Sequence, residues 1–212
     1  MSTDARLAAA ILAGGASQRL GGADKSSLAI GGTSILDRIL SAVQPVTARI
    51  FAVGDRHGAA ARAGLTVVDD VVRDAGALGG IYTAIVGSPC DRTLIVGCDM
   101  PFLTTSFLAH LAAITGADVV IPRDRTGWQP LCAIYSRVCA DGIRARLDRG
   151  ERQAAPPPAG VRVIEIGPGE LAPYDPEGLL FVNVNTPHDY AQAQRLLEKA
   201  GRPMLPRIPD HS

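Results

Sequence analysis

The sequence has no excess of charge and no long apolar run, and each absence excludes a class of protein. Lys plus Arg and Asp plus Glu each number 21, so the formal net charge is zero. This balance argues against a cationic surface for duplex nucleic acid or for acidic membranes. No apolar stretch approaches the ~18 residues of a membrane-spanning helix. The first residues also lack the basic and then apolar pattern of a secretory signal. We therefore expect neither a nucleic-acid partner nor a membrane.

The cysteines and histidines form no recognisable metal or nucleophilic site. No two cysteines form a C-x-x-C pair, so a zinc ribbon or a redox motif has no support. The cysteines are Cys90, Cys98, Cys132 and Cys139. Reduced, mostly buried thiols are typical of a cytoplasmic protein, and that is the location we expect. The four histidines lie in unrelated contexts and are expected to be non-catalytic; they are His57, His110, His188 and His211.

Aromatic residues are scarce, at 4%, whereas glycine is frequent, at 23 residues, which favours short aliphatic elements joined by tight turns. Apolar runs predict strands over residues 7–12, 49–53, 66–68, 93–96, 118–121, 131–135, 161–166 and 180–182. Helical patterns alternate with them over residues 35–43, 78–86, 104–114, 137–149 and 187–200. Ser34 and Pro45 mark the two ends of the first helix. This order predicts an α/β fold with a Rossmann-like, mostly parallel twisted sheet and helices on both faces. We expect one domain over residues 1–200 and a Pro-rich tail over 201–212.

A glycine-rich loop follows the first predicted strand and runs from Leu12 to Lys25. Gly14 and Gly15 allow the backbone to bend sharply and to bring bare amides up to a ligand. Consecutive amides in such a turn bind anions, and Arg19 and Lys25 add positive charge. The loop is not a Walker A motif, because an aspartate precedes the lysine where that motif has glycine. The sequence therefore predicts a phosphate-binding loop of another kind.

A single carboxylate, Asp99, follows the aliphatic strand predicted over residues 93–96. Because ligands bind at the carboxyl ends of strands in open α/β sheets, we expect Asp99 beside the glycine-rich loop. Mg²⁺ commonly takes one or two carboxylates together with substrate phosphate oxygens. Asp99 is therefore a candidate metal ligand, although an aspartate at this point could also simply cap the turn that follows.

These motifs together resemble the MobA-like nucleotidyltransferases, and within that family the molybdenum cofactor guanylyltransferases. The matching blocks occur in the family's order over residues 7–195. They are Leu12-Ala13-Gly14-Gly15 with Ser17, Arg19, Gly21, Asp24 and Lys25; Val68-Asp69-Asp70; Gly76-Ala77-Leu78-Gly79-Gly80; Cys98-Asp99-Met100-Pro101; Gln129-Pro130-Leu131; and Phe181-Val182-Asn183-Val184-Asn185-Thr186-Pro187. The last block narrows the resemblance to the guanylyltransferases. The resemblance implies a three-layer α/β/α fold of the nucleotide-diphospho-sugar transferase type.

The resemblance also implies a reaction, the Mg²⁺-dependent transfer of GMP from GTP to molybdopterin with release of pyrophosphate. The attacking terminal phosphate of molybdopterin is already an anion, which fits the absence of a nucleophile–base pair. GTP and the molybdenum cofactor would be the small-molecule partners. Molybdoenzymes or other proteins of cofactor biosynthesis would be further partners.

The resemblance implies a role for each matching residue. Leu12, Ala13, Gly14 and Gly15 would hold the guanine and its phosphates through their backbone, and Asp70 would contact the nucleotide. Lys25 and Arg19 would neutralise the triphosphate, and Asp99 would bind both Mg²⁺ and GTP. Lys25, Arg19 and Asp99 are thus the predicted catalytic residues. Asn183 and Asn185 would face the pterin substrate or the metal, while a turn before the last helix is the alternative role for both.

Two departures from the family pattern bear on these roles. Val53 stands at the end of the second strand, where the family often has an asparagine that contacts the nucleotide. Residues 153–160 are rich in Ala and Pro where the family continues with aliphatic residues. This segment follows Gly150-Glu151-Arg152 and could affect the acceptor side.

Three other functions stay open at this stage. They are a cytidylyltransferase for the same cofactor, a sugar-phosphate nucleotidyltransferase and a non-catalytic nucleotide-binding protein. Gly14 favours guanine over cytosine because it places no methyl group against the base, and a positive φ at this position would add strain to any substitution.

Overall fold

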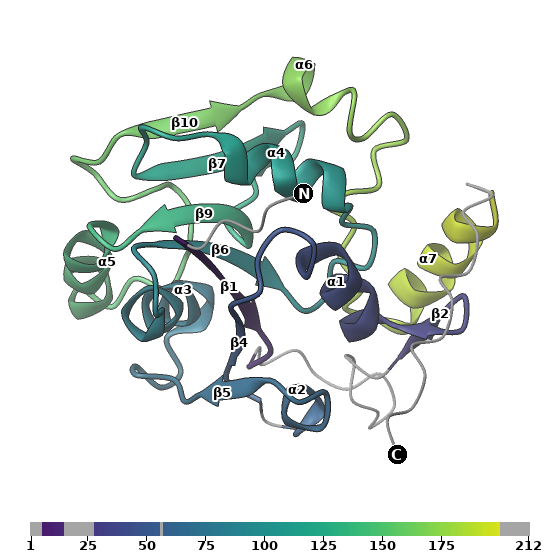
Figure 1. The fold of residues 1–212 in the computed structure, drawn as a ribbon, viewed down its shortest axis with the longest axis horizontal. Helices are drawn as coiled ribbons and strands as arrows, with labels where there is room; N and C mark the ends of the chain where they lie inside the picture. The colour runs from purple at the N-terminus through teal and green to yellow at the C-terminus, as the bar shows by residue number, and fades with distance from the viewer. Residues whose placement is uncertain (1–5, 15–27, 56, 200–212) are drawn as a thin grey trace.

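A twisted sheet forms the centre of the protein. The computed structural model describes residues 6–14, 28–55 and 57–199 (Figure 1). The strand order is β10-β7-β9-β6-β1-β4-β5, with β8 paired to β7. The strands are β1 (Leu7–Leu12), β4 (Ile50–Val53), β5 (Thr66–Val68), β6 (Arg92–Gly97), β7 (Val119–Asp124), β8 (Gly127–Trp128), β9 (Cys132–Ser136) and β10 (Val163–Ile166). A separate hairpin joins β2 (Ala29–Ile30) to β3 (Thr33–Ser34). The pairings of β1 with β4 and β6, of β4 with β5 and of β7 with β10 are parallel, and β9 runs antiparallel to β6 and β7.

Helices cover both faces of this sheet, as the sequence predicts. Figure 1 shows α3 (Gly76–Gly87) and α5 (Cys139–Asp148) together on one side of the strands and α1 (Ile35–Val43) on the other. Helix α4 (Thr105–Ala113) packs in the same core cluster as α1, and α7 (Pro187–Lys199) contacts β2. Two short helices, α2 (Ala59–Arg62) and α6 (Pro168–Leu171), lie in the connections. The predicted α/β architecture is therefore confirmed.

Alternation along β1 divides the core into two layers. Leu7, Ala9 and Ile11 belong to the cluster that contains α1 and α4, whereas Ala8 and Ala10 belong to the cluster that contains α3 and α5. All five residues are completely buried. Because successive side chains of a strand point to opposite faces, one short apolar strand supports both layers.

Helix α1 has the boundaries that its sequence signals predict. The Ser34 hydroxyl oxygen accepts a hydrogen bond from the Asp37 backbone N–H at 3.0 Å, which satisfies one of the helix's free donors. The helix ends at Val43, two residues before Pro45, which cannot continue a helical hydrogen-bond ladder.

The strand predicted over residues 180–182 is wrong. Leu180 and Phe181 are buried, so the apolar run does enter the core. It does so as a turn, because the Asp175 carboxylate accepts hydrogen bonds from the backbone N–H groups of Leu179 and Leu180 at 2.6 and 3.1 Å. These bonds satisfy the backbone without a neighbouring strand. Five of the short elements were not predicted from the sequence: β2, β3, α2, β8 and α6.

The described residues include no helix long and apolar enough to cross a bilayer. The predicted tail over residues 201–212 lies outside the described residues, and the single-domain boundary near residue 200 stays a prediction.

Candidate nucleotide-binding site

The carboxyl ends of four parallel strands meet at one edge of the sheet. Leu12 at the end of β1 is in register with Val53 of β4 and with Gly97 of β6, and Val53 is in register with Val68 of β5. The residues that follow each strand therefore lie side by side: Ala13 and Gly14, Gly54, Asp69 and Asp70, and Cys98 and Asp99. This arrangement brings the described start of the glycine-rich loop, Asp70 and Asp99 to one edge, where open α/β sheets bind ligands.

Two glycines, Gly14 and Gly54, bring the ends of β1 and β4 into contact. A Cβ atom on Gly14 would lie 3.1 Å from the Gly54 Cα and 3.4 Å from Asp70 Oδ2. A Cβ atom on Gly54, whose φ is +59°, would lie 3.0 Å from the Gly14 Cα and 3.1 Å from the same oxygen. The φ of Gly14 is not in the left-handed region, so the strain considered from the sequence does not apply there. Close backbone approach, rather than a special φ, is what favours glycine at this position.

Val53 lies in the core and not at the site. Its side chain is 1% exposed and belongs to the cluster between the sheet, α3 and α5. The next polar residue, Asp55, accepts a hydrogen bond from the Ala61 backbone N–H at 2.8 Å and so stabilises the start of α2. In this part of the chain, the Gly54 backbone and the Asp70 carboxylate border Gly14.

Asp99 follows β6 and is fixed by the segment that precedes α7. The Asn185 side-chain amide donates to Asp99 Oδ2 at 3.2 Å, and the Val184 backbone N–H donates to the Asp99 carbonyl oxygen at 2.9 Å. Asp99 Oδ1 lies over the end of the strand, since a Cβ atom on Gly97 would be 2.8 Å from it. The structure thus brings together two predicted site residues, Asp99 and Asn185, that are far apart in sequence.

The other predicted residues divide into two groups. Gly15, Arg19 and Lys25 lie outside the described residues. Asn183 is described and exposed, two residues from Asn185. The roles assigned to all of the site residues from the sequence stay predictions.

The first half of α3 borders the same edge of the sheet. A Cβ atom on Gly80 would lie 3.2 Å from Leu12 Cδ1, so this glycine makes room for the last side chain of β1. At the start of the helix, the Leu78 backbone N–H donates to the Arg152 carbonyl oxygen at 3.3 Å. Gly76 has a φ of +61°, and a Cβ there would lie 3.2 Å from that oxygen. The turn after α5 therefore packs directly on the helix that borders Leu12.

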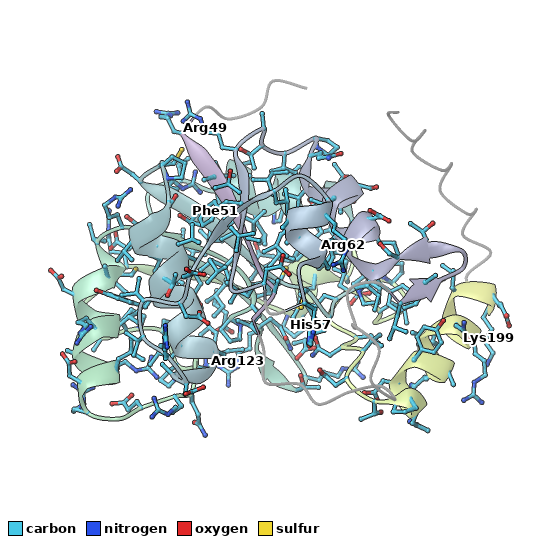
Figure 2. All side chains as sticks on the ribbon, turned by 90° about the horizontal axis from the view of Figure 1, so that it is seen from below. Arg49, Phe51, His57, Arg62, Arg123 and Lys199 are labelled. Carbon is cyan, nitrogen blue, oxygen red and sulfur yellow. The ribbon has the colours of Figure 1, made fainter. Side chains whose placement is uncertain are left out.

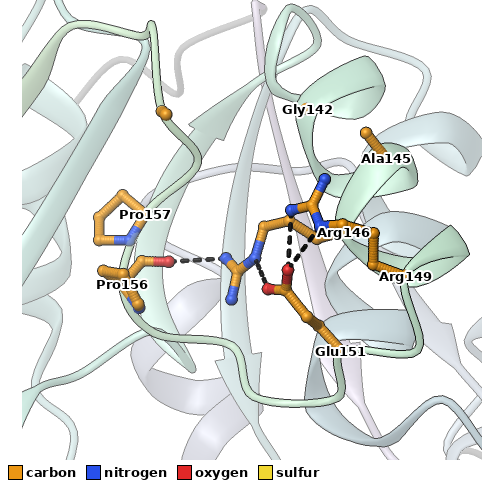
Figure 3. Close-up of a pocket in the computed structure, with 8 residues that line it drawn as sticks. Gly142, Ala145, Arg146, Arg149, Glu151, Pro156 and Pro157 are labelled. Carbon is orange, nitrogen blue, oxygen red and sulfur yellow. Dashed lines mark hydrogen bonds and ion pairs between the residues drawn. The ribbon is translucent and has the colours of Figure 1, made fainter.

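Arg146 of α5 holds this turn and the Ala- and Pro-rich segment after it. Its guanidinium donates to Glu151 Oε2 and to the carbonyl oxygen of Pro156, both at 2.7 Å (Figure 3). It also donates to the carbonyl oxygen of Gln153 at 2.8 Å. The hydrogen bond from Arg146, reinforced by one from Arg149, lowers the pKa of Glu151. The cavity of about 370 Å³ in Figure 3 is lined by Arg146, Arg149, Glu151 and Pro156 among others, and its lining includes no residue of the edge that contains Gly14 and Asp99. Sequence analysis missed Arg146, because an arginine on an amphipathic helix is usually exposed, whereas this one is 8% exposed.

Comparison with known protein families agrees with this site. The family model described as the MobA-like NTP transferase domain matches residues 9–158, well over half of the chain. The chain belongs to the MobA-like NTP transferase family. The match includes the glycine-rich loop, Asp70 and Asp99, and it ends before Asn183 and Asn185.

Curated relatives extend the MobA-like similarity over nearly the whole chain. A probable molybdenum cofactor guanylyltransferase of Pelotomaculum thermopropionicum is 32% identical, over 90% of this chain and 93% of its own. A molybdenum cofactor guanylyltransferase of Mesorhizobium japonicum is 35% identical, over 91% of this chain and 96% of its own. These similarities confirm the resemblance to the MobA-like nucleotidyltransferases that the sequence motifs indicated.

Solved structures agree on the fold. Molybdopterin-guanine dinucleotide biosynthesis protein A from Archaeoglobus fulgidus is 25% identical with a TM-score of 0.75, covering 90% of this chain and 98% of that one. A nucleotidyl transferase from Methanothermobacter thermautotroptrophicus is 21% identical with a TM-score of 0.68, covering 92% and 99%. The 2-C-methyl-D-erythritol 4-phosphate cytidylyltransferase of Thermus thermophilus has the same fold at 12% identity, with a TM-score of 0.64. The fold is therefore shared by transferases that use different nucleotides, and the base must be chosen by local contacts.

The carboxylates at the edge fit a divalent ion that binds together with a nucleotide. Among residues 6–14, 28–55 and 57–199, no group of three or more His, Cys, Asp or Glu side chains is placed to hold a metal ion. Mg²⁺ is usually held by one or two carboxylates together with water and substrate phosphate oxygens. Asp99, half-buried at the end of β6, is a donor of this type.

Proposed function

We propose that this MobA-like protein transfers GMP from GTP to molybdopterin and releases pyrophosphate. The observation that carries the proposal is the meeting of the Gly14–Gly54 contact, the Asp70 carboxylate and Asp99 at one edge of the sheet. The curated relatives named molybdenum cofactor guanylyltransferase support the choice of substrates. Molybdoenzymes or other proteins of cofactor biosynthesis stay predicted partners, and a cytoplasmic location stays a prediction.

The chain's own groups would act by positioning and by neutralising charge. The backbone at Ala13 and Gly14 would approach the nucleotide closely, because no side chain separates it from Gly54 or Asp70. Arg19 and Lys25 would neutralise the phosphates. Asp99 would hold Mg²⁺, which when bound neutralises further charge on the triphosphate. Preorganised charge of this kind stabilises a phosphoryl-type transition state without a protein nucleophile.

A ligand-stability experiment tests the nucleotide assignment. The free energy of unfolding is measured with GTP, CTP, ATP or UTP in the presence of Mg²⁺. A nucleotide that binds only the folded protein at 100 times its dissociation constant adds ~2.7 kcal/mol. GTP is expected to give the largest shift. A larger shift with CTP would indicate a cytidylyltransferase, and no shift with any nucleotide would refute the proposal.

Replacement of Asp99 tests the metal assignment. Asp99→Ala is expected to lower kcat at least ~100-fold with the fold intact, because charge stabilisation is lost mainly in the transition state. Asp91→Ala is the matched control. Asp91 immediately precedes the other end of β6, its side chain is 92% exposed, and its ion pair with Arg137 has an N–O distance of 3.6 Å. Near-normal activity of the Asp99 variant would contradict the assignment.

A further inference from the structure

The segment between Asn183 and Asn185 is bound to Asp99 at two points. The Val184 backbone N–H donates to the carbonyl oxygen of Asp99, and the Asn185 amide donates to its carboxylate. Val184 itself is completely buried in the core. The main chain on each side of the contact is thus fixed, and the Asn185 side chain is directed at the carboxylate.

Helix α7 anchors this segment from the other side. The Asp189 carboxylate accepts hydrogen bonds from the backbone N–H groups of Asn185 and Thr186 at 3.0 and 2.8 Å. In return, Thr186 Oγ1 accepts one from the Asp189 backbone N–H at 3.1 Å. The hydrogen bond from the Asn185 backbone is the largest of the effects that lower the pKa of Asp189. This reciprocal cap fixes the backbone of Asn185 at the entry to α7.

The two oxygens of the Asp99 carboxylate have different surroundings. Oδ2 accepts the Asn185 amide, whereas Oδ1 lies above Gly97, where a Cβ atom would be only 2.8 Å away. A carboxylate without such contacts rotates broadly about its last torsion. The bare glycine leaves room for this orientation, and the Asn185 amide stabilises it.

Asn183 has different surroundings from Asn185. Asn183 is exposed, and no hydrogen bond of its side chain is found within the described part of the chain. Asn185 is half-buried and bonded to Asp99. The two asparagines of one motif therefore differ in what they can contact.

We propose that Asn185 is a positioning residue that orients the Asp99 carboxylate, so that the entry to α7 forms part of the metal–nucleotide site. This inference rests on the proposed function, because it assumes that Asp99 binds a metal together with GTP. It assigns the acceptor-side role expected for both asparagines to Asn183 alone. Residues that orient metal ligands through hydrogen bonds typically change metal affinity or activity 10–100-fold when they are replaced.

The test measures how much Mn²⁺ strengthens GTP binding, with no acceptor present. Calorimetric titration gives the dissociation constant of GTP in EDTA and at saturating Mn²⁺, and the ratio of the two is the metal-dependent gain. In Asn185→Ala this gain is expected to fall ~10-fold, with the dissociation constant in EDTA unchanged. In Asn183→Ala the gain is expected to equal that of the parent. In a separate turnover assay with molybdopterin, this variant is expected to have a higher KM for molybdopterin.

Thr186→Ala controls for general damage to α7, because it removes only the hydrogen bond from the Asp189 backbone N–H to Thr186 Oγ1. The bond between the Asp189 carboxylate and the Asn185 backbone, and the Asn185 amide itself, stay in place. Thr186→Ala is expected to lower the free energy of unfolding and to keep the metal-dependent gain. An unchanged gain in Asn185→Ala, or an equal loss in Thr186→Ala, would overturn the positioning role and leave the proposed function standing. A parent protein that binds no GTP under either condition would overturn both.

Discussion

The substitution Gly97→Ala tests whether the position of the Asp99 carboxylate limits the reaction. Gly97 is the last residue of β6, and its φ is not left-handed, so alanine is compatible with the backbone. The new Cβ atom would lie 2.8 Å from Asp99 Oδ1 and 3.5 Å from the Leu131 Cβ atom. The contact with Leu131 is ordinary. The contact with Oδ1 is not, so the carboxylate must move by about 0.6 Å to reach the 3.4 Å at which ordinary contacts begin.

A displacement of this size should cost activity but not stability. A misplacement of about 1 Å at a reacting centre can cost ~100-fold in rate, so we expect kcat to fall by about tenfold or more. Replacing a strand glycine by alanine reduces the entropy of the unfolded chain and commonly adds about 0.5 kcal/mol or more to stability. The variant is therefore expected to be less active and no less stable than the parent.

The assay combines pyrophosphate release at saturating GTP, molybdopterin and Mg²⁺ with urea unfolding of the same samples. Gly169→Ala in α6 is the control, because a Cβ atom there would meet nothing within 4 Å and the residue's φ is not left-handed. Full activity of Gly97→Ala would refute the importance of the carboxylate's position. A loss of activity in Gly97→Ala that is explained by an equal loss of stability would also refute the importance of the carboxylate's position.

Further predictions concern the loop, its charges and the Glu151 ion pair. Gly14→Ala places a Cβ atom 3.1 Å from the Gly54 Cα and should shift the loop backbone against the nucleotide, so we expect GTP turnover to fall about tenfold, which corresponds to about 1.4 kcal/mol. The larger purine should be affected more than cytosine, and an unchanged GTP/CTP ratio of kcat/KM would show that Gly14 does not select the base. Lys25→Ala should weaken GTP binding and slow turnover. Lys199→Ala should do neither, since Lys199 is exposed on the last helix at the edge of the molecule (Figure 2). Equal effects of the two substitutions would mean that Lys25 is merely solvated. Glu151→Gln should lower the free energy of unfolding, measured in urea, by a constant amount above pH 4.5. The difference between variant and parent should shrink as the pH falls through the lowered pKa of Glu151 in the folded protein, because protonation of Glu151 abolishes its ion pair with Arg146. A difference that does not depend on pH would contradict that origin.

The sequence was sufficient to predict the layers of the fold and the edge of the sheet at which the site lies. Aliphatic runs such as Leu7–Leu12 predicted buried strands, and Ser34 and Pro45 predicted the ends of α1, because these signals act within a few residues. The parallel order of the strands then required the residues after β1, β5 and β6 to share one edge.

The contacts that define the site were not predictable in the same way, because they join segments far apart in sequence. The Gly14–Gly54 contact depends on the distance between two strands, which no local pattern reports. The bond from Asn185 to Asp99 depends on how the chain returns to the sheet after Leu180 and Phe181, where the predicted strand proved to be a turn. A short apolar run cannot distinguish a buried strand from a buried turn, because burial requires only that its backbone groups find partners.

The most direct test of the proposed function is the transfer itself. Protein, Mg²⁺ and molybdopterin are incubated with GTP, CTP, ATP or UTP labelled at the α-phosphate, and both released pyrophosphate and label joined to the pterin are measured. The account predicts that GTP gives one labelled guanine dinucleotide for each pyrophosphate released, that omission of molybdopterin stops both, and that Asp99→Ala lowers both at least ~100-fold. Preferential transfer from CTP, or GTP binding with no label on the pterin, would contradict it.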